Sequence, residues 1–268
     1  MIRHLGALAT LGLVGLVVWM GSDLAIRGAS GFSSGYLFEA PRDLGRAGGI
    51  GPILVSTAVV VSLATVLAIL VSLPTAIAYT ELAHASGSRR VLHAILDVGV
   101  GVPWIVWGLF GGVFFGGILG FGFSLLTGIV TLACLLAPIL ATGFIAGLQA
   151  VDPALHNQCD ALGVSRWTTV WRQVIPAARP ALIASVALAA GRGCGDAAAL
   201  MFTAGVTSAM PQSVFDPGAT LAVHVFHLLA TVPGGQQAAY TAAAVLFGLT
   251  LMIQVGIACT QRKEGLTL

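Results

Sequence analysis

Charged residues are scarce in this sequence. Of its 268 residues only 8% are Asp, Glu, Lys or Arg, whereas 57% are hydrophobic. A soluble domain carries about 25% charged residues, so this chain has too little polar surface to cover a globule in water. That excludes a soluble globular protein. The net charge is only +2, and a balance this close to zero gives no basis for nucleic-acid binding.

Cysteine and lysine are also rare. The four cysteines show no CxxC spacing and no pairing pattern, so we interpret them as small apolar core residues, without a metal or disulfide role; they are Cys134, Cys159, Cys194 and Cys259. The only lysine is Lys263, close to the C-terminus. A P-loop, G-x-x-x-x-G-K-[ST], therefore cannot form, and we expect no cofactor on this chain.

Long stretches contain no charge at all: 4–22, 47–80, 98–151 and 217–261. A membrane-spanning helix needs about 20 apolar residues, so the stretch 98–151 has room for two, with a turn at Gly116–Gly122. The first apolar stretch is longer than the core of a signal peptide, which favours an uncleaved first span. We predict an all-α integral membrane protein with six transmembrane helices, at 5–26, 51–79, 91–116, 122–148, 180–203 and 236–260.

Six spans place both termini on one side of the membrane. Basic residues are concentrated on that side: Arg3, Arg89, Arg90, Arg166, Arg172, Arg179, Arg262 and Lys263, against Arg27, Arg42 and Arg46 on the other. The positive-inside rule makes the more basic side cytoplasmic. We therefore expect three parts: 1–50, the first helix and an external loop; 51–260, a core of five helices; and 261–268, a cytoplasmic tail.

The cytoplasmic loop 149–179, between the fourth and fifth spans, has the pattern of a helical hairpin. Asp152-Pro153 is a favourable helix start, with Asp as the N-cap and Pro at the first helical position. Gly163 is suited to end that helix, and a second amphipathic stretch runs from 165 to 174, up to Ile175-Pro176. A helix–Gly–helix hairpin on this side could dock a partner protein. Alternatively it is a connector whose arginines lie on anionic lipid headgroups.

The external loop 204–235 contains one apolar stretch with helical periodicity. We expect a short helix there, at the interface or dipping into the membrane. His224 and His227 lie three residues apart on one face, but two histidines without a third ligand are weak evidence for a metal site.

The same cytoplasmic loop carries a family resemblance. Gly163 followed twelve residues later by Ile175-Pro176 resembles the EAA loop of permeases in ATP-binding cassette importers. Further stretches narrow the resemblance to phosphate-specific permeases of the PstA type. They are GGIGPILVST (48–57), GVPWIVWGLFG (101–111), GRGCGDAAALMFTAG (191–205) and FDPGATLAVHVFHL followed by QQAAY (215–240).

The resemblance implies a complex in the bacterial cytoplasmic (inner) membrane. The partners would be a PstC-type permease that completes a heterodimer, a PstB-type ATPase dimer that binds ATP and Mg, a phosphate-binding protein, membrane lipid and the substrate, phosphate. It implies that the loop contacts the ATPase through Asp160, Ala161, Gly163, Arg166, Ile175 and Pro176. The sequence departs from the family in two places: Asn157-Gln158-Cys159 replaces Glu-Ala-Ala, and Asp196 replaces a glutamate.

Arg192 and Asp196 are the candidate substrate-pathway residues. A charged residue at the centre of a span costs about 2.5–3.5 kcal/mol on insertion scales and usually faces a bundle interior or a pathway. In a helix over 180–203 the two would share a face at spacing i,i+4. The guanidinium fork suits a tetrahedral oxyanion. Asp196 could hold Arg192 in place when the site is empty, and could accept a hydrogen bond from the proton that phosphate keeps and sulfate lacks. The alternatives are a packing pair, or another oxyanion such as sulfate, molybdate or a phosphonate.

An intramembrane aspartyl protease is a more distant alternative. Gly193-Cys194-Gly195-Asp196 fits the G-x-G-D pattern of such enzymes, and Pro180-Ala181-Leu182 matches their P-A-L motif. However, the P-A-L motif precedes G-x-G-D instead of following it. The one candidate for a second aspartate is Asp97, and an arginine near Asp196 opposes a shared proton.

Overall fold

The computed structural model describes residues 2–82 and 86–264. Within them the chain is mostly helical, with long loops and one antiparallel pair of two-residue strands, Pro41–Arg42 (β1) and Ala47–Gly48 (β2). The longer helices are α1 (Ile2–Ala29), α2 (Gly51–Ile77), α3 (Ser86–Gly101), α5 (Leu125–Gln149), α8 (Ile175–Cys194) and α11 (Gln236–Glu264). The shorter elements are η1 (Asp43–Gly45), η2 (Ala78–Leu82), α4 (Trp104–Gly111), η3 (Gly112–Ile118), α6 (Pro153–Ala161), α7 (Arg166–Thr169), η4 (Val170–Val174), α9 (Ala198–Met201) and α10 (Leu221–Ala230).

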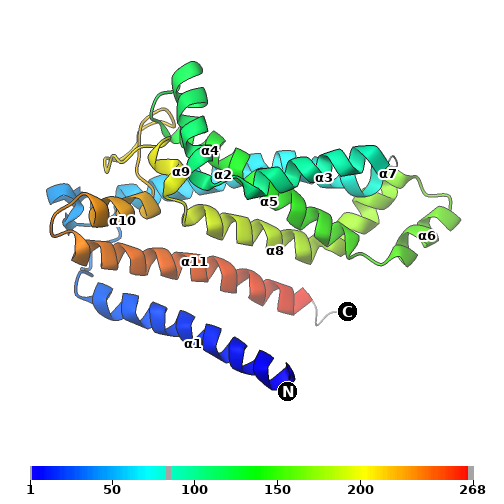
Figure 1. Ribbon diagram of the computed structural model, residues 1–268, viewed down its shortest axis with the longest axis horizontal. Coiled ribbons are helices and arrows are strands. Elements are labelled where there is room, and N and C mark those ends of the chain that lie inside the picture. The colour runs from blue at the N-terminus through cyan, green and yellow to red at the C-terminus, as the bar shows by residue number, and fades with distance from the viewer. Residues whose placement is uncertain (1, 83–85, 265–268) are drawn as a thin grey trace.

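The long helices run side by side along the longest axis of the molecule (Figure 1). α5 packs against α2 and α8, α8 packs against α11, and α1 lies outermost on α11. The largest apolar cluster lies between α2, α5 and α8 and includes the fully buried Val60, Ala64, Leu132, Leu136 and Leu140. α10 is tied to α2 because the backbone N–H of Leu221 donates a 2.8 Å hydrogen bond to the Thr57 hydroxyl.

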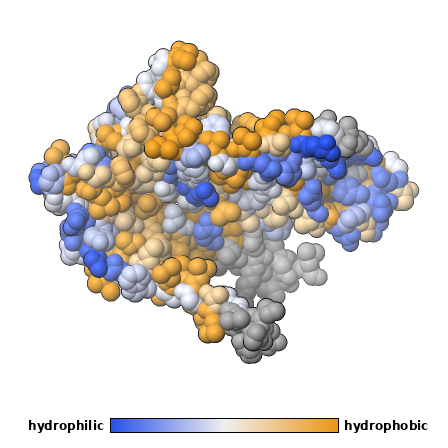
Figure 2. All heavy atoms as spheres, viewed as in Figure 1, coloured by the Kyte–Doolittle hydropathy of each residue, from blue (hydrophilic) through white to orange (hydrophobic). Residues whose placement is uncertain are grey.

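The membrane-protein prediction agrees with this architecture. Five helices are long and apolar enough to cross a membrane, or six if one bent pair counts as a single span. Large apolar side chains are exposed along the outer faces, where lipid would cover them, for example Leu11 and Trp19 on α1 and Leu70 on α2. In Figure 2 hydrophilic residues gather at the end of the molecule that carries α6.

The predicted third span, 91–116, is not one helix. Its two parts, residues 89–101 and 104–118, meet at an angle of 93°. The break falls at Val102–Pro103, where Pro103 has no backbone N–H to continue the helix and instead precedes the first residue of α4. In Figure 1 α4 and η3 form an arm that leaves the bundle. Gly120 and Gly122, both with positive φ, then turn the chain back into α5, as the glycine-rich stretch predicted.

The predicted fifth span, 180–203, is displaced. The helical path begins at Arg166, continues through η4 into α8, and ends at Cys194. Ile175-Pro176 therefore does not end the second hairpin helix. The missing N–H of Pro176 is accommodated because wider π-helical turns in η4 precede it. At the other end, Gly195 to Ala197 separate α8 from the short α9.

Candidate functional site

The loop 149–179 forms the predicted hairpin. The Asp152 carboxylate accepts a 2.8 Å hydrogen bond from the Ala154 N–H, with Pro153 in the first turn of α6. Gly163 ends this helix with a φ of +67°, which is a left-handed conformation that glycine adopts without steric cost. Ser165 then caps α7 through the Thr168 N–H. The first short helix therefore begins and ends where the local sequence predicted, whereas the second begins there but continues through η4 into α8.

The hairpin lies at the end of the bundle where α1 begins and α11 ends (Figure 1). Asp160, Ala161 and Gly163 lie together at its exposed tip. Next to them are exposed apolar side chains that the sequence reasoning did not single out: Leu162 is 80% exposed and Trp167 is 62% exposed. Trp167 packs against Trp171 with 5.6 Å between ring centres. By contrast, Ile175 and Pro176 lie at the start of α8, away from this tip.

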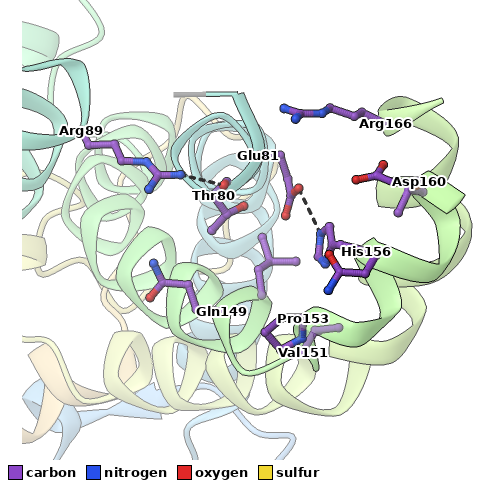
Figure 3. A pocket seen from close by; sticks show the side chains of 12 residues that line it. Thr80, Glu81, Arg89, Gln149, Val151, Pro153, His156, Asp160 and Arg166 are labelled. Atoms are coloured by element: carbon purple, nitrogen blue, oxygen red, sulfur yellow. Dashed lines mark hydrogen bonds and ion pairs between the residues drawn. The ribbon is translucent and has the colours of Figure 1, made fainter. Parts of the chain in front are cut away.

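A polar cavity of about 380 Å³ separates the hairpin from the end of α2. Figure 3 shows Glu81, from η2, pointing across it toward His156 on α6, with Asp160 and Arg166 beside them. The Glu81 carboxylate lies 3.3 Å from the His156 ring nitrogen. Asn157, from the altered EAA stretch, also lines the cavity, whereas Cys159 is buried.

Arg192 and Asp196 are not a same-face pair within one helix, which corrects the sequence-based expectation. Arg192 lies in the last turn of α8 and is exposed, whereas Asp196 follows the end of that helix and is only 3% exposed. One Asp196 carboxylate oxygen accepts a 3.2 Å hydrogen bond from the Ala199 N–H. Its other oxygen is buried without a hydrogen-bond partner within residues 2–82 and 86–264. No ion pair joins Asp196 to Arg192.

The contact that Arg192 does make is with an aromatic ring. Its guanidinium carbon lies over the Trp104 indole, 4.4 Å from the ring centre. Trp104 is the first residue of α4, directly after the break at Pro103. α4 is fixed by close packing on α9: a Cβ on Gly108 would lie 2.6 Å from the Ala199 Cα. The sequence could not reveal this contact, because the two residues lie on distant segments.

The structure does not bring together the residues of the other candidate sites, which are the aspartate pair of a protease and a metal site at the histidines. Asp97 contacts His93 on its own helix at 2.7 Å and is exposed, so it does not accompany the buried Asp196. Across the described residues, no three His, Cys, Asp or Glu side chains are placed to hold a metal ion, which leaves His224 and His227 on α10 without a third ligand. The described cysteines are unpaired; the side chain of Cys259 and residues 265–268 of the predicted tail lie outside the described part.

Comparison with known proteins agrees with this architecture. The family model described as the binding-protein-dependent transport system inner membrane component matches residues 71–258. The probable ABC transporter permease protein YqgI of Bacillus subtilis is 28% identical over 249 residues, covering 87% of this chain and 85% of that protein. The phosphate transport system permease protein PstA 1 of Mycobacterium tuberculosis is 32% identical over 169 residues, covering 63% of this chain and 54% of that protein.

The fold also matches a solved structure, that of the inward-facing MetNI methionine ABC transporter. The match has a TM-score of 0.65 and 18% sequence identity, and covers 80% of this chain and 95% of that chain. These relatives are transport permeases and not enzymes, which excludes the aspartyl protease alternative. Their names state different substrates, phosphate for PstA 1 and methionine for MetNI.

Proposed function

We propose that this chain, which belongs to the family of binding-protein-dependent transport system inner membrane components, passes inorganic phosphate across the bacterial cytoplasmic membrane. It is a permease subunit of an ATP-binding cassette importer. Phosphate is the substrate that best fits two independent observations. One is the similarity to PstA 1, which is 32% identical over 169 residues that cover 63% of this chain. The other is the state of Arg192.

Arg192 is the single observation that carries this proposal. A guanidinium within a largely apolar chain usually has a carboxylate partner, because an unpaired charge is costly in a membrane. Arg192 has neither an ion pair nor a hydrogen bond to any described residue, and its side chain faces outward from α8. Its rigid fork of donors is therefore free to bind a tetrahedral oxyanion between this chain and a second permease.

Asp196 supplies the proposed discrimination. Its unpartnered carboxylate oxygen would repel a fully ionised oxyanion, but it can accept a hydrogen bond from the proton that phosphate retains near neutral pH. Sulfate has no such proton, so it would leave a repulsive oxygen–oxygen contact. Asp196 thus stands where the family has a glutamate. Its shorter side chain also accepts a hydrogen bond from the Ala199 N–H in the first turn of α9.

The remaining subunits follow from what this chain lacks and exposes. Because this sequence has no lysine before Lys263, it cannot form a P-loop; in the proposed importer a separate PstB-type ATPase dimer would bind ATP and Mg. We propose that the ATPase docks on the hairpin tip, where Asp160, Ala161 and Gly163 lie beside Leu162. Arg166 lines the cavity behind the tip, and Ile175 and Pro176 lie at the start of α8, so these three residues are not part of the proposed docking surface. A PstC-type permease and a phosphate-binding protein complete the proposed importer.

The test is uptake of radiolabelled phosphate by cells that lack every other phosphate system and express this chain with its partner subunits. Unlabelled sulfate, molybdate and a phosphonate are added as competitors. The proposal predicts that unlabelled phosphate competes and the other anions do not. Competition by one of those anions at lower concentration than phosphate would assign the same architecture to another oxyanion.

A further inference from the structure

The environment of Arg192 is unusual among the arginines whose side chains the structure describes. Two other described arginines lie over aromatic rings, at greater distances, and each also donates a hydrogen bond to an oxygen. They are Arg27, over Tyr240 at 5.3 Å with Asp23 at 2.8 Å, and Arg89, over Tyr79 at 5.9 Å with the Thr80 carbonyl at 3.0 Å. Arg192, at 4.4 Å from the Trp104 ring centre, has the closest ring and no oxygen partner in the described chain.

A ring and a carboxylate hold an arginine in different ways. A carboxylate neutralises the guanidinium and occupies its paired N–H donors, so an incoming anion must displace it. The face of an indole attracts the cation through the negative face of its π-system and offers no charged oxygen to compete. An arginine that is fixed by tryptophan alone therefore keeps its positive charge and its donors available for an anionic ligand.

The position of Trp104 in the fold makes this contact a fixed one. Pro103 ends the preceding helix and Trp104 starts α4, so the 93° bend directs the ring back toward the end of α8. The close approach of Gly108 to Ala199 holds α4 against α9. α9 is in turn capped by Asp196. The ring, the guanidinium and the carboxylate are thus positioned by one packing arrangement.

We propose that Trp104 is a positioning residue for anion transport: it holds Arg192 by a cation–π contact in an orientation in which the guanidinium can bind the anion. This rests on the proposed function, since Trp104 acts through Arg192. It replaces the sequence-based idea that Asp196 holds the arginine. Trp104→Leu should lower phosphate uptake by between about twofold and about thirtyfold, which is the range that cation–π energies span, while Trp104→Phe should retain part of the activity.

Substitution by leucine also changes packing, so the decisive variants keep the shape of the ring. Tryptophans with one to four fluorine atoms are introduced at position 104 by nonsense suppression in the full importer. Each fluorine weakens the negative face of the ring with little change in size. Uptake of radiolabelled phosphate, corrected for the amount of chain in the membrane, should fall stepwise with the number of fluorine atoms. The matched series at Trp107, a partly buried residue of the same helix whose buried indole N–H has no partner among the described residues, should be flat.

The outcomes separate this inference from the proposed function. Equal uptake across the series at position 104, with Arg192→Ala inactive, would overturn the positioning role and leave Arg192 as the anion ligand. Equal slopes at positions 104 and 107 would also overturn it, because the effect would then be one of general packing. Normal uptake by Arg192→Ala would overturn the proposed function and this inference together.

Discussion

The Nε2 atom of His156 lies 3.3 Å from the Glu81 carboxylate and joins α6 of the hairpin to the end of α2. The two residues are far apart in the sequence, and both side chains are partly buried, at 35% and 15% exposed. Through this contact a movement of the hairpin would be transmitted to the second span, which packs along α5 at the centre of the bundle. We therefore expect the contact to couple the proposed ATPase-docking surface to the membrane core.

Glu81→Gln should weaken that link without breaking the fold. A partly exposed pair is worth about 0.2–1 kcal/mol, so we expect phosphate uptake to fall by less than about fivefold while the ATPase still copurifies. Asp97→Asn is the matched control, because its 2.7 Å contact with His93 stays within α3 and should leave uptake unchanged. Equal effects of the two substitutions would show that the Glu81–His156 contact transmits nothing.

Gly163 should tolerate no β-branched residue. Its φ of +67° is unfavourable for any side chain, by about 1–2 kcal/mol, although a Cβ there would meet no atom within 4 Å. Gly163→Val should therefore reshape the hairpin and lower both uptake and copurification of the ATPase, with the chain still present in the membrane.

Gly120 provides the control for that substitution. It has a φ of +77° and equally open surroundings, but in the sequence it follows η3 (Gly112–Ile118) and not the hairpin. Gly120→Val carries a similar backbone cost and should leave ATPase copurification intact. If Gly163→Val copurifies normally and transports normally, the hairpin is a connector on the lipid surface.

The orientation of the chain should follow the distribution of basic residues. Reporter fusions placed after Arg90 and within 165–172 should report the cytoplasm, and a fusion near Asp216 should report the outside. The hairpin and both ends of the described chain lie at one end of the bundle (Figure 1). An external signal within 165–172 would invert the topology and remove the hairpin from reach of an ATPase.

Asp196→Asn separates the two functions of that side chain. The amide oxygen can still accept the hydrogen bond from the Ala199 N–H, so the amount of folded chain should be unchanged, whereas Asp196→Ala removes the cap at a cost of about 1 kcal/mol. Because Asp196→Asn removes the negative charge of the carboxylate, sulfate should compete with phosphate for uptake more strongly in this variant than in the wild type. Equal loss of transport for both anions, with no change in their ratio, would assign Asp196 to the cap alone.

The features that sequence predicted correctly depend on local chemistry. Asp152-Pro153 and Gly163 mark helix ends because capping and positive φ are decided within a few residues. Gly195 and Asp196 are equally local signals. Together they could have predicted that α8 ends at Cys194 and that Asp196 accepts a hydrogen bond from the start of the next helix. The charge-free stretches identified most spans because spanning length is a property of the segment itself.

The features that sequence did not predict depend on tertiary contacts. Pro74 and Pro138 lie inside intact helices, whereas Pro103, which follows Gly99 and Gly101 in the sequence, lies at a 93° break. Beyond the break α4 packs on α9. The same packing brings Trp104 over Arg192, so the partner of the candidate anion ligand became apparent only once the fold was known.

The most direct test of the central claim is phosphate uptake by Arg192→Ala in cells without any other phosphate system. Arg179→Ala, near the start of the same helix and thus at the end that we expect on the cytoplasmic side, is the control for removing a positive charge from α8. We predict that Arg192→Ala falls to the background of cells lacking the chain, that Arg192→Lys restores little because an ammonium is a point donor, and that Arg179→Ala transports normally. Normal uptake by Arg192→Ala, at equal membrane abundance, would contradict the account.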